Sequence, residues 1–199
     1  MLNKIAKRLT AKLLSNKIIA EDMSDIYIYG FELLFSFFFS TTIIVIIGVL
    51  LGRILQTLMF LLIFVLLRSF TGGYHANTYA VCTVVTFSIF GGVLLLSELV
   101  VLPLFLYTIL AGLGLVIMLV FVPIEHPNKK ITDEQKRKYK NMSIILFSTF
   151  VTVGALLCYA DIQLNTVVFF TLIADLLLLF VKNRKKGENE HEIFGNHSG

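Results

Sequence analysis

The chain of 199 residues is 57% hydrophobic and only 15% charged, whereas about a quarter of the residues of a soluble domain are charged. Its formal net charge of +4 is compatible with a nucleic-acid partner, but the basic residues flank apolar segments and no aromatic–basic interleaving marks a nucleic-acid groove. The composition therefore indicates an integral membrane protein and argues against nucleic-acid binding.

Residues 1–30 form an N-terminal segment that begins basic and amphipathic. Five Lys and Arg residues lie within residues 1–20, and apolar residues recur there at helical spacing: Leu2, Ile5, Leu9, Leu13 and Ile19. An amphipathic helix on an anionic leaflet fits this pattern. The alternative is a solvated helix that only adds positive charge. A cleaved signal peptide does not fit, because lysines interrupt the apolar stretch.

Residues 31–181 predict a domain of six transmembrane helices. The apolar stretch 33–67 contains one charge, Arg53, and is too long for one crossing, since about 20 residues span the hydrocarbon. We expect two helices that meet near residues 48–53. The second should begin before Ile54, with Arg53 reaching toward the membrane interface.

The remaining apolar stretches predict four further crossings. Residues 79–124 contain a single charge and should form two helices joined by a tight turn at residues 97–103. Residues 142–160 and 162–181 give two more, separated only by Asp161. The predicted fold is therefore all-α and polytopic.

Two polar segments lie outside these crossings. The loop 125–141 contains six basic residues, Lys129, Lys130, Lys136, Arg137, Lys138 and Lys140. Within it, Thr132 and Gln135 have the spacing of a capping box and predict the start of a short helix. The tail 182–199 begins basic, turns acidic, and is expected to be unstructured.

The charge distribution predicts the orientation of the six helices. All but Arg53 of the 17 Lys and Arg residues fall on one side of the membrane if there are six crossings. Positive residues accumulate on the cytoplasmic side. We therefore expect both termini, and the loop that follows the second helix, in the cytoplasm.

That loop is part of a polar segment, residues 68–82, which interrupts the apolar sequence and holds a histidine and a cysteine. A histidine can remove a thiol proton and leave the more nucleophilic thiolate, which makes His75 a candidate base and Cys82 a candidate nucleophile. In one straight helix the two would be separated by about 10.5 Å of rise, too far for a hydrogen bond. The hypothesis therefore requires a break, which Gly72 and Gly73 permit. The alternative is that both residues only pack.

Three other residues are candidates for supporting roles. Arg68 either stabilises the thiolate, binds a substrate carboxylate, or only marks the end of the second helix. Gly73 is interpreted as a backbone hinge. Asp175 lies inside the sixth crossing, where an acid is costly. It either orients His75 as the third member of a triad, faces a polar channel, or packs through hydrogen bonds.

The sequence contains no motif that is typical of metal, phosphate-binding or serine hydrolase chemistry. The remaining histidines lack metal-ligand spacing, and no phosphate-binding glycine loop, G-x-S-x-G or H-E-x-x-H motif is present. We therefore expect neither a metal nor a cofactor.

Arg68, Gly72, Gly73, His75 and Cys82, placed between two apolar segments of a chain of this length, resemble the accessory gene regulator protein B family of bacterial membrane cysteine endopeptidases. The resemblance implies that His75 and Cys82 are the catalytic pair, and it supports Arg68 and Gly73 as functional residues. It further implies a short membrane-associated signalling propeptide as substrate, cleaved through a thioester and cyclised to a thiolactone or lactone. A homodimer in the bacterial cell membrane, with the site facing the cytoplasm, is also implied.

One hypothesis about the substrate and one alternative function remain open. Propeptides of this family carry an acidic C-terminal tail, and the six basic residues of the loop 125–141 would suit it by charge alone. The alternative function is a multi-pass transporter or membrane scaffold without peptidase activity, although no repeat between the two halves supports transport.

Overall fold

Seven helices make up the described part of the protein, a computed structural model that covers residues 2–16, 18–20, 23–71, 79–101, 103–122 and 132–195. They are α1 (Leu2–Ser15), α2 (Ser24–Leu50), α3 (Ile54–Thr71), α4 (Tyr79–Leu99), α5 (Leu104–Phe121), α6 (Asp133–Ala160) and α7 (Ile162–Gly195). Helices α2 to α7 are long and apolar enough to cross a membrane, and their outward faces expose many large apolar side chains. The predicted all-α fold with six candidate crossings is confirmed.

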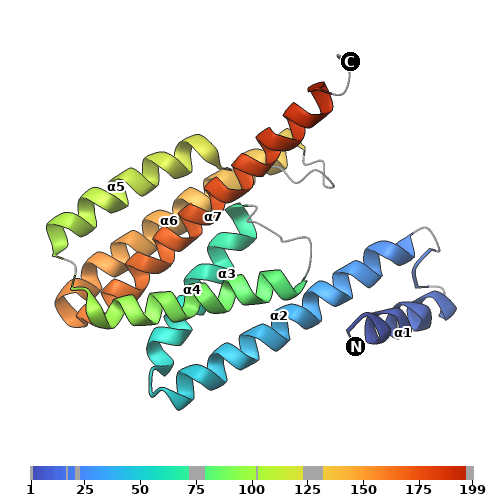
Figure 1. The fold of residues 1–199 in the computed structure, drawn as a ribbon, viewed down its shortest axis with the longest axis horizontal. Helices are drawn as coiled ribbons and strands as arrows, with labels where there is room; N and C mark the ends of the chain where they lie inside the picture. Colours follow the sequence, from blue (N-terminus) through green and yellow to red (C-terminus); the bar gives the residue numbers. More distant parts are fainter. Residues whose placement is uncertain are drawn as a thin grey trace.

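Helix α7 lies at the centre of the bundle. It packs against α3, α4, α5 and α6, and Figure 1 shows it passing between them. Val167, Val168 and Leu172 are fully or almost fully buried. Because lipid tails are as apolar as these side chains, close packing rather than water exclusion holds such helices together.

Three turns gather at one end of the bundle, here called the Arg53 end. Helix α2 stops in a Schellman motif, in which Gly52 adopts φ 66° and the Arg53 N–H donates to the Gly48 carbonyl (2.8 Å). Helices α4 and α5 are joined by residues 100–103, and α6 and α7 by Asp161 alone, as predicted. Asp161 caps α7 by accepting hydrogen bonds from the N–H groups of two following residues, both at 3.0 Å.

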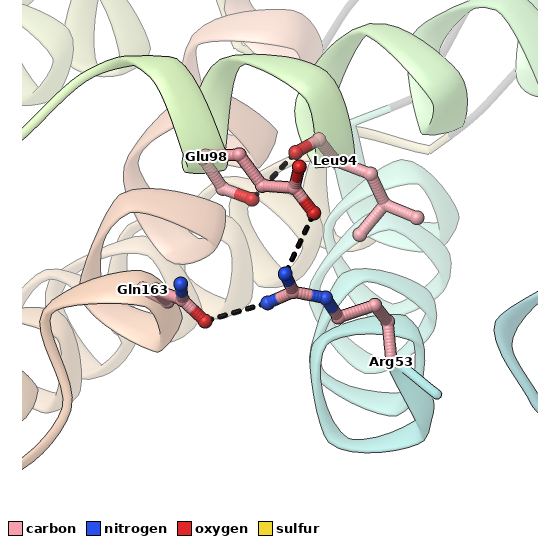
Figure 2. Close-up of polar contacts among 5 residues, drawn as sticks. Arg53, Leu94, Glu98 and Gln163 are labelled. Carbon is pink, nitrogen blue, oxygen red and sulfur yellow. Dashed lines mark hydrogen bonds and ion pairs between the residues drawn. The ribbon is translucent and has the colours of Figure 1, made fainter. Parts of the chain in front are cut away.

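Arg53 ties these three turns together (Figure 2). Its Nη2 forms an ion pair of 2.8 Å with Oε1 of Glu98, and its Nη1 donates a hydrogen bond of 2.6 Å to Oε1 of Gln163. Two expectations are corrected here. Helix α3 begins at Ile54 and not earlier, because Gly52 in the left-handed region ends the preceding helix. Arg53 also has protein partners and does not merely reach toward the interface.

Two further boundaries differ from the predictions. The capping box is present, since Thr132 Oγ1 accepts from the Gln135 N–H and the Gln135 side chain accepts from the Thr132 N–H, both at 3.4 Å. It begins the long helix α6 and not a separate short one. Helix α7 continues to Gly195, so the expectation of an unstructured tail is corrected for residues 182–195. That stretch is rich in Lys, Arg and Glu, which favour helix.

Helix α1 packs against α2, beside which it lies in Figure 1. The packed face consists of small residues, since Ala6 and Thr10 are buried. Ile5 and Leu9, which belong to the predicted apolar face, remain exposed. An amphipathic N-terminal helix is therefore present, with apolar side chains left on its outer surface.

Helix α2 contacts the bundle tightly only near its C-terminal end. Its buried residues are Ile44 and Gly48, and Gly48 lies directly against Thr57 of α3. Toward Ser24 the helix diverges from α3, while α1 lies beside it (Figure 1).

Candidate active site

Arg68 and Cys82 contact each other at the end of the bundle opposite Arg53, here called the Cys82 end. Arg68 lies in the last turn of α3 and Cys82 in the first turn of α4. Arg68 Nη2 donates toward Cys82 Sγ across 3.7 Å. Helix α3 ends at Thr71 and α4 begins at Tyr79. Residues 72–78 lie outside the described residues, so the break that a histidine–cysteine pair requires stays a prediction.

The guanidinium of Arg68 is held by two further features. It lies over the ring of Phe64, 5.1 Å from the ring centroid, an arrangement that favours a cation. It is also close enough to Asp175 of α7 for an electrostatic interaction between the two charges. The side chain that faces the thiol is therefore positioned by three helices.

Asp175 is buried, with 6% of its surface exposed. Its Oδ2 accepts no hydrogen bond from the residues that the structure describes. The nearby Arg68 guanidinium acts on this carboxyl group electrostatically. The role of Asp175 in the site stays a prediction.

A cavity of about 790 Å³ opens beside these residues, between α2 on one side and α3 and α4 on the other. Arg68 and Cys82 both line it. The α2 wall is formed by Tyr29, Gly30, Leu33, Leu34, Ser36, Phe37, Ser40, Thr41 and Ile44, and the opposite wall by Leu61, Phe64, Val65, Arg68, Ser69, Cys82, Thr83 and Thr86. The thiol therefore faces a space that a ligand can enter.

Three hydroxyl groups of this lining donate hydrogen bonds to backbone carbonyls of their own helices. Ser40 donates to the Ser36 carbonyl (2.8 Å), Ser69 to that of Val65 (2.7 Å), and Thr86 to that of Cys82 (2.9 Å). Such back-bonding is usual for Ser and Thr in helices. A hydroxyl that donates in this way still has a lone pair for accepting a hydrogen bond. The cavity is thus suited to groups that donate, such as peptide N–H.

The predicted site residues are brought together only in part. Arg68 contacts Cys82 and interacts with Asp175. His75 and Gly73 lie outside the described residues, so the distance between His75 and Cys82 stays a prediction.

Of the basic loop, Arg137 and Lys138 are exposed and Lys136 and Lys140 are half-buried in the first turns of α6, whereas Lys129 and Lys130 are not described. Within the described ranges, no three His, Cys, Asp or Glu side chains are grouped to hold a metal ion.

The sequence interpretation missed the contribution of α2 to this site. It treated residues 33–67 only as membrane-crossing segments. A signal was nevertheless present, because Ser36 and Ser40, one turn apart on the same helix face, and the adjacent Thr41 place small polar groups in a strongly apolar stretch.

Comparison with known proteins identifies the family of this chain. Residues 3–181 match the family described as Accessory gene regulator B. AgrB-like protein 2 of Clostridium perfringens (strain 13 / Type A) is 28% identical over 172 residues, which cover 80% of this chain and 79% of that protein. An AgrB-like protein of strain SM101 / Type A is 28% identical over 170 residues, covering 76% and 78%. No solved structure matches. Because the match extends over nearly all of the membrane domain, the chain belongs to the accessory gene regulator B family.

Proposed function

We propose that this protein is a membrane cysteine endopeptidase that cleaves a short signalling propeptide and closes the product into a thiolactone or lactone ring. Membership of the accessory gene regulator B family implies a role in quorum-sensing peptide processing. The observation that carries the finer proposal is the Cys82 thiol, which faces the cavity with the Arg68 guanidinium 3.7 Å from its sulfur.

The first step is acyl transfer to Cys82. His75 accepts the thiol proton, and the thiolate attacks a peptide carbonyl of the propeptide. The C–N bond breaks, the proton passes from His75 to the departing amine, and the C-terminal fragment leaves. The remaining part of the propeptide is then bound to Cys82 as a thioester.

The second step closes the ring. A thiol or hydroxyl side chain within the bound propeptide attacks the thioester carbonyl and transfers its proton to the Cys82 thiolate through His75. No water or external energy source is consumed, because the acyl group passes from one heteroatom to another. Ring closure therefore depends on the internal nucleophile reacting before water does.

Arg68 and Asp175 support these steps electrostatically. A cation beside the sulfur favours the thiolate and also the oxyanion that develops on the attacked carbonyl. Asp175 keeps the guanidinium in place from the opposite helix. Gly73 provides the hinge that brings His75 back to Cys82.

The proposed setting is the bacterial cell membrane, with both termini and the Cys82 end in the cytoplasm. The basic residues near the start of α6 attract the acidic tail of the propeptide, and α1 lies on the anionic leaflet. Two copies of the chain form a dimer. These proposals are based on the distribution of positive charge and on the family resemblance.

The test is co-expression with the peptide encoded by a short reading frame beside the gene, which should be amphipathic, contain Cys or Ser, and end in an acidic tail. We expect wild-type protein to release the C-terminal fragment, and Cys82→Ala and His75→Ala to release none. Cys158→Ala is the matched control, because Cys158 is the other cysteine of the chain and does not line the cavity. Cleavage that persists in both active-site variants would leave the transporter or scaffold alternative.

A further inference from the structure

We propose that the cavity between α2, α3 and α4 holds the ring-forming residues of the propeptide while they are bound to Cys82, and so favours cyclisation over hydrolysis. This inference rests on the proposed function and assigns a substrate segment to a specific part of the site. The occupant is an uncharged, largely apolar peptide segment whose C-terminal carbonyl lies at Cys82.

The position of the cavity fits an acyl group attached to Cys82. Cys82, Arg68 and Gly30 line it at the Cys82 end, and its lining follows α2 as far as Ile44. From Gly30 to Ile44 the helix rises about 20 Å. A thioester on Cys82 therefore places the preceding residues of the substrate at the mouth of a space that leads into the bundle.

The size of the cavity fits a short peptide. Its volume of about 790 Å³ lies within the range of roughly 300–1,000 Å³ that is usual for sites of small ligands. A long amphipathic helix is too large for this space, whereas a ring of a few residues is not. The segment nearest to the thioester is thus the part that the cavity admits.

The lining explains why ring closure would prevail over hydrolysis. Large apolar side chains form most of both walls, among them Leu33, Phe37, Leu61 and Phe64. Such walls disfavour water near the thioester. They also confine the substrate's own nucleophile, which raises its effective concentration at the carbonyl.

The polar groups of the lining suit a peptide backbone more than a lipid tail. Ser40 and Thr86 present hydroxyl oxygens whose protons are already donated to carbonyls of their own helices. These oxygens can accept from the peptide N–H groups of a compact ring. Arg68 is the only charged residue among the described residues of the lining and lies where the attacked carbonyl must be. An acidic segment would place most of its carboxylates against apolar walls, at a high cost.

The test fills the cavity and measures how the acyl group is partitioned. Thr41 lines the cavity, whereas its neighbour Thr42 does not and is exposed on the outer face of α2. Thr41→Phe and Thr42→Phe therefore form a matched pair. Gly30→Leu is a second filling variant, because a Cβ at Gly30 meets nothing within 4 Å, so this variant should fold.

Each full-length variant is co-expressed with the same candidate propeptide, and mass spectrometry gives the ratio of cyclic to linear product. We expect Thr41→Phe and Gly30→Leu to lower the ratio about tenfold, because a displaced nucleophile loses effective molarity. Thr42→Phe should match wild type. An unchanged ratio in both filling variants would overturn the inference, and it is the result expected if a lipid simply occupies the space. An equal loss of the cyclic and the linear product would also overturn it. Failure of the proposed function appears separately, as cleavage that does not require Cys82.

Discussion

The guanidinium of Arg53 and the carboxylate of Glu98 form an ion pair of 2.8 Å that joins the turn after α2 to the last turn of α4. The same guanidinium donates to Gln163 at the start of α7. One side chain thus connects three segments that are far apart in the sequence. The arrangement fixes the Arg53 end of the bundle while α2 diverges from it toward the Cys82 end.

The first prediction concerns the strength of this pair. Both partners are partly exposed, so the net contribution of the pair should be about 0.2–1 kcal/mol, as for other accessible ion pairs. Arg53→Gln and Glu98→Gln should each lower the thermal midpoint of the detergent-solubilised protein, and the double variant should lose less than the sum. Strict additivity in this double-mutant cycle would show that the two side chains do not interact.

The second prediction concerns the contact between Gly48 and Thr57. A Cβ at Gly48 would overlap the Thr57 side chain, which is fully buried and donates 2.8 Å to the Arg53 carbonyl. Gly48→Ala should therefore destabilise the protein by about 1–3 kcal/mol, as overpacking usually does. Gly91→Ala is the control, because a Cβ there meets nothing within 4 Å. Thermal unfolding of both variants in the same detergent gives the comparison, and equal midpoints would contradict the close approach.

The number and order of the helices could be predicted because a membrane imposes one strong rule. Each crossing needs about 20 apolar residues, and the charges at Arg53, Glu98 and Asp161 mark the ends of crossings, whereas Asp175 lies within one. The boundaries of the helices depend on capping hydrogen bonds and glycine conformation, which hydropathy does not reveal. The Schellman motif at Gly52 ended α2, and a capping box that looks like the start of a short helix began a crossing instead.

The candidate site could be predicted only where residues are close in the sequence. Arg68 and Cys82 belong to one segment, and their contact follows once α3 and α4 are antiparallel neighbours. The interaction of Asp175 with Arg68 depends on how α7 packs, and the α2 wall of the cavity depends on where α2 diverges. Hydropathy reports neither, since most residues that face the cavity are as apolar as those that face lipid; only the small polar residues of α2, such as Ser36 and Ser40, mark its wall.

The third prediction concerns the reactivity of Cys82. Removing the positive charge in Arg68→Gln should slow alkylation of Cys82 by a membrane-permeant maleimide about fivefold, as expected for a net interaction of about 1 kcal/mol. Arg68→Lys keeps the charge but not the planar group that lies over Phe64, so its effect should be intermediate. A Cys158→Ala background leaves Cys82 as the only thiol. Equal rates in all three proteins would show that Arg68 does not affect the sulfur.

The fourth prediction separates the role of Asp175 from that of Arg68. If the carboxylate acts by holding the guanidinium, Asp175→Asn should slow the alkylation of Cys82 in wild-type background and have little further effect in Arg68→Gln. The same maleimide assay measures both. Asp175→Leu is not suitable as the only variant, since it also changes shape and packing. Independent, additive effects of Asp175→Asn and Arg68→Gln would exclude a role through Arg68.

The fifth prediction concerns the basic residues at the start of α6. Arg137 and Lys138 are exposed, so they can attract an acidic peptide tail from solution. Replacing both by Gln should raise the KM for the propeptide, leave kcat nearly unchanged, and make processing less sensitive to salt, because exposed charges are screened within about 10 Å at 0.1 M. Lys4→Gln with Lys7→Gln removes the same charge from exposed positions of α1 and controls for net charge. If the two double variants change KM equally, the tail does not bind at α6 in particular. If neither variant changes KM at low salt, the acidic tail is recognised without these charges.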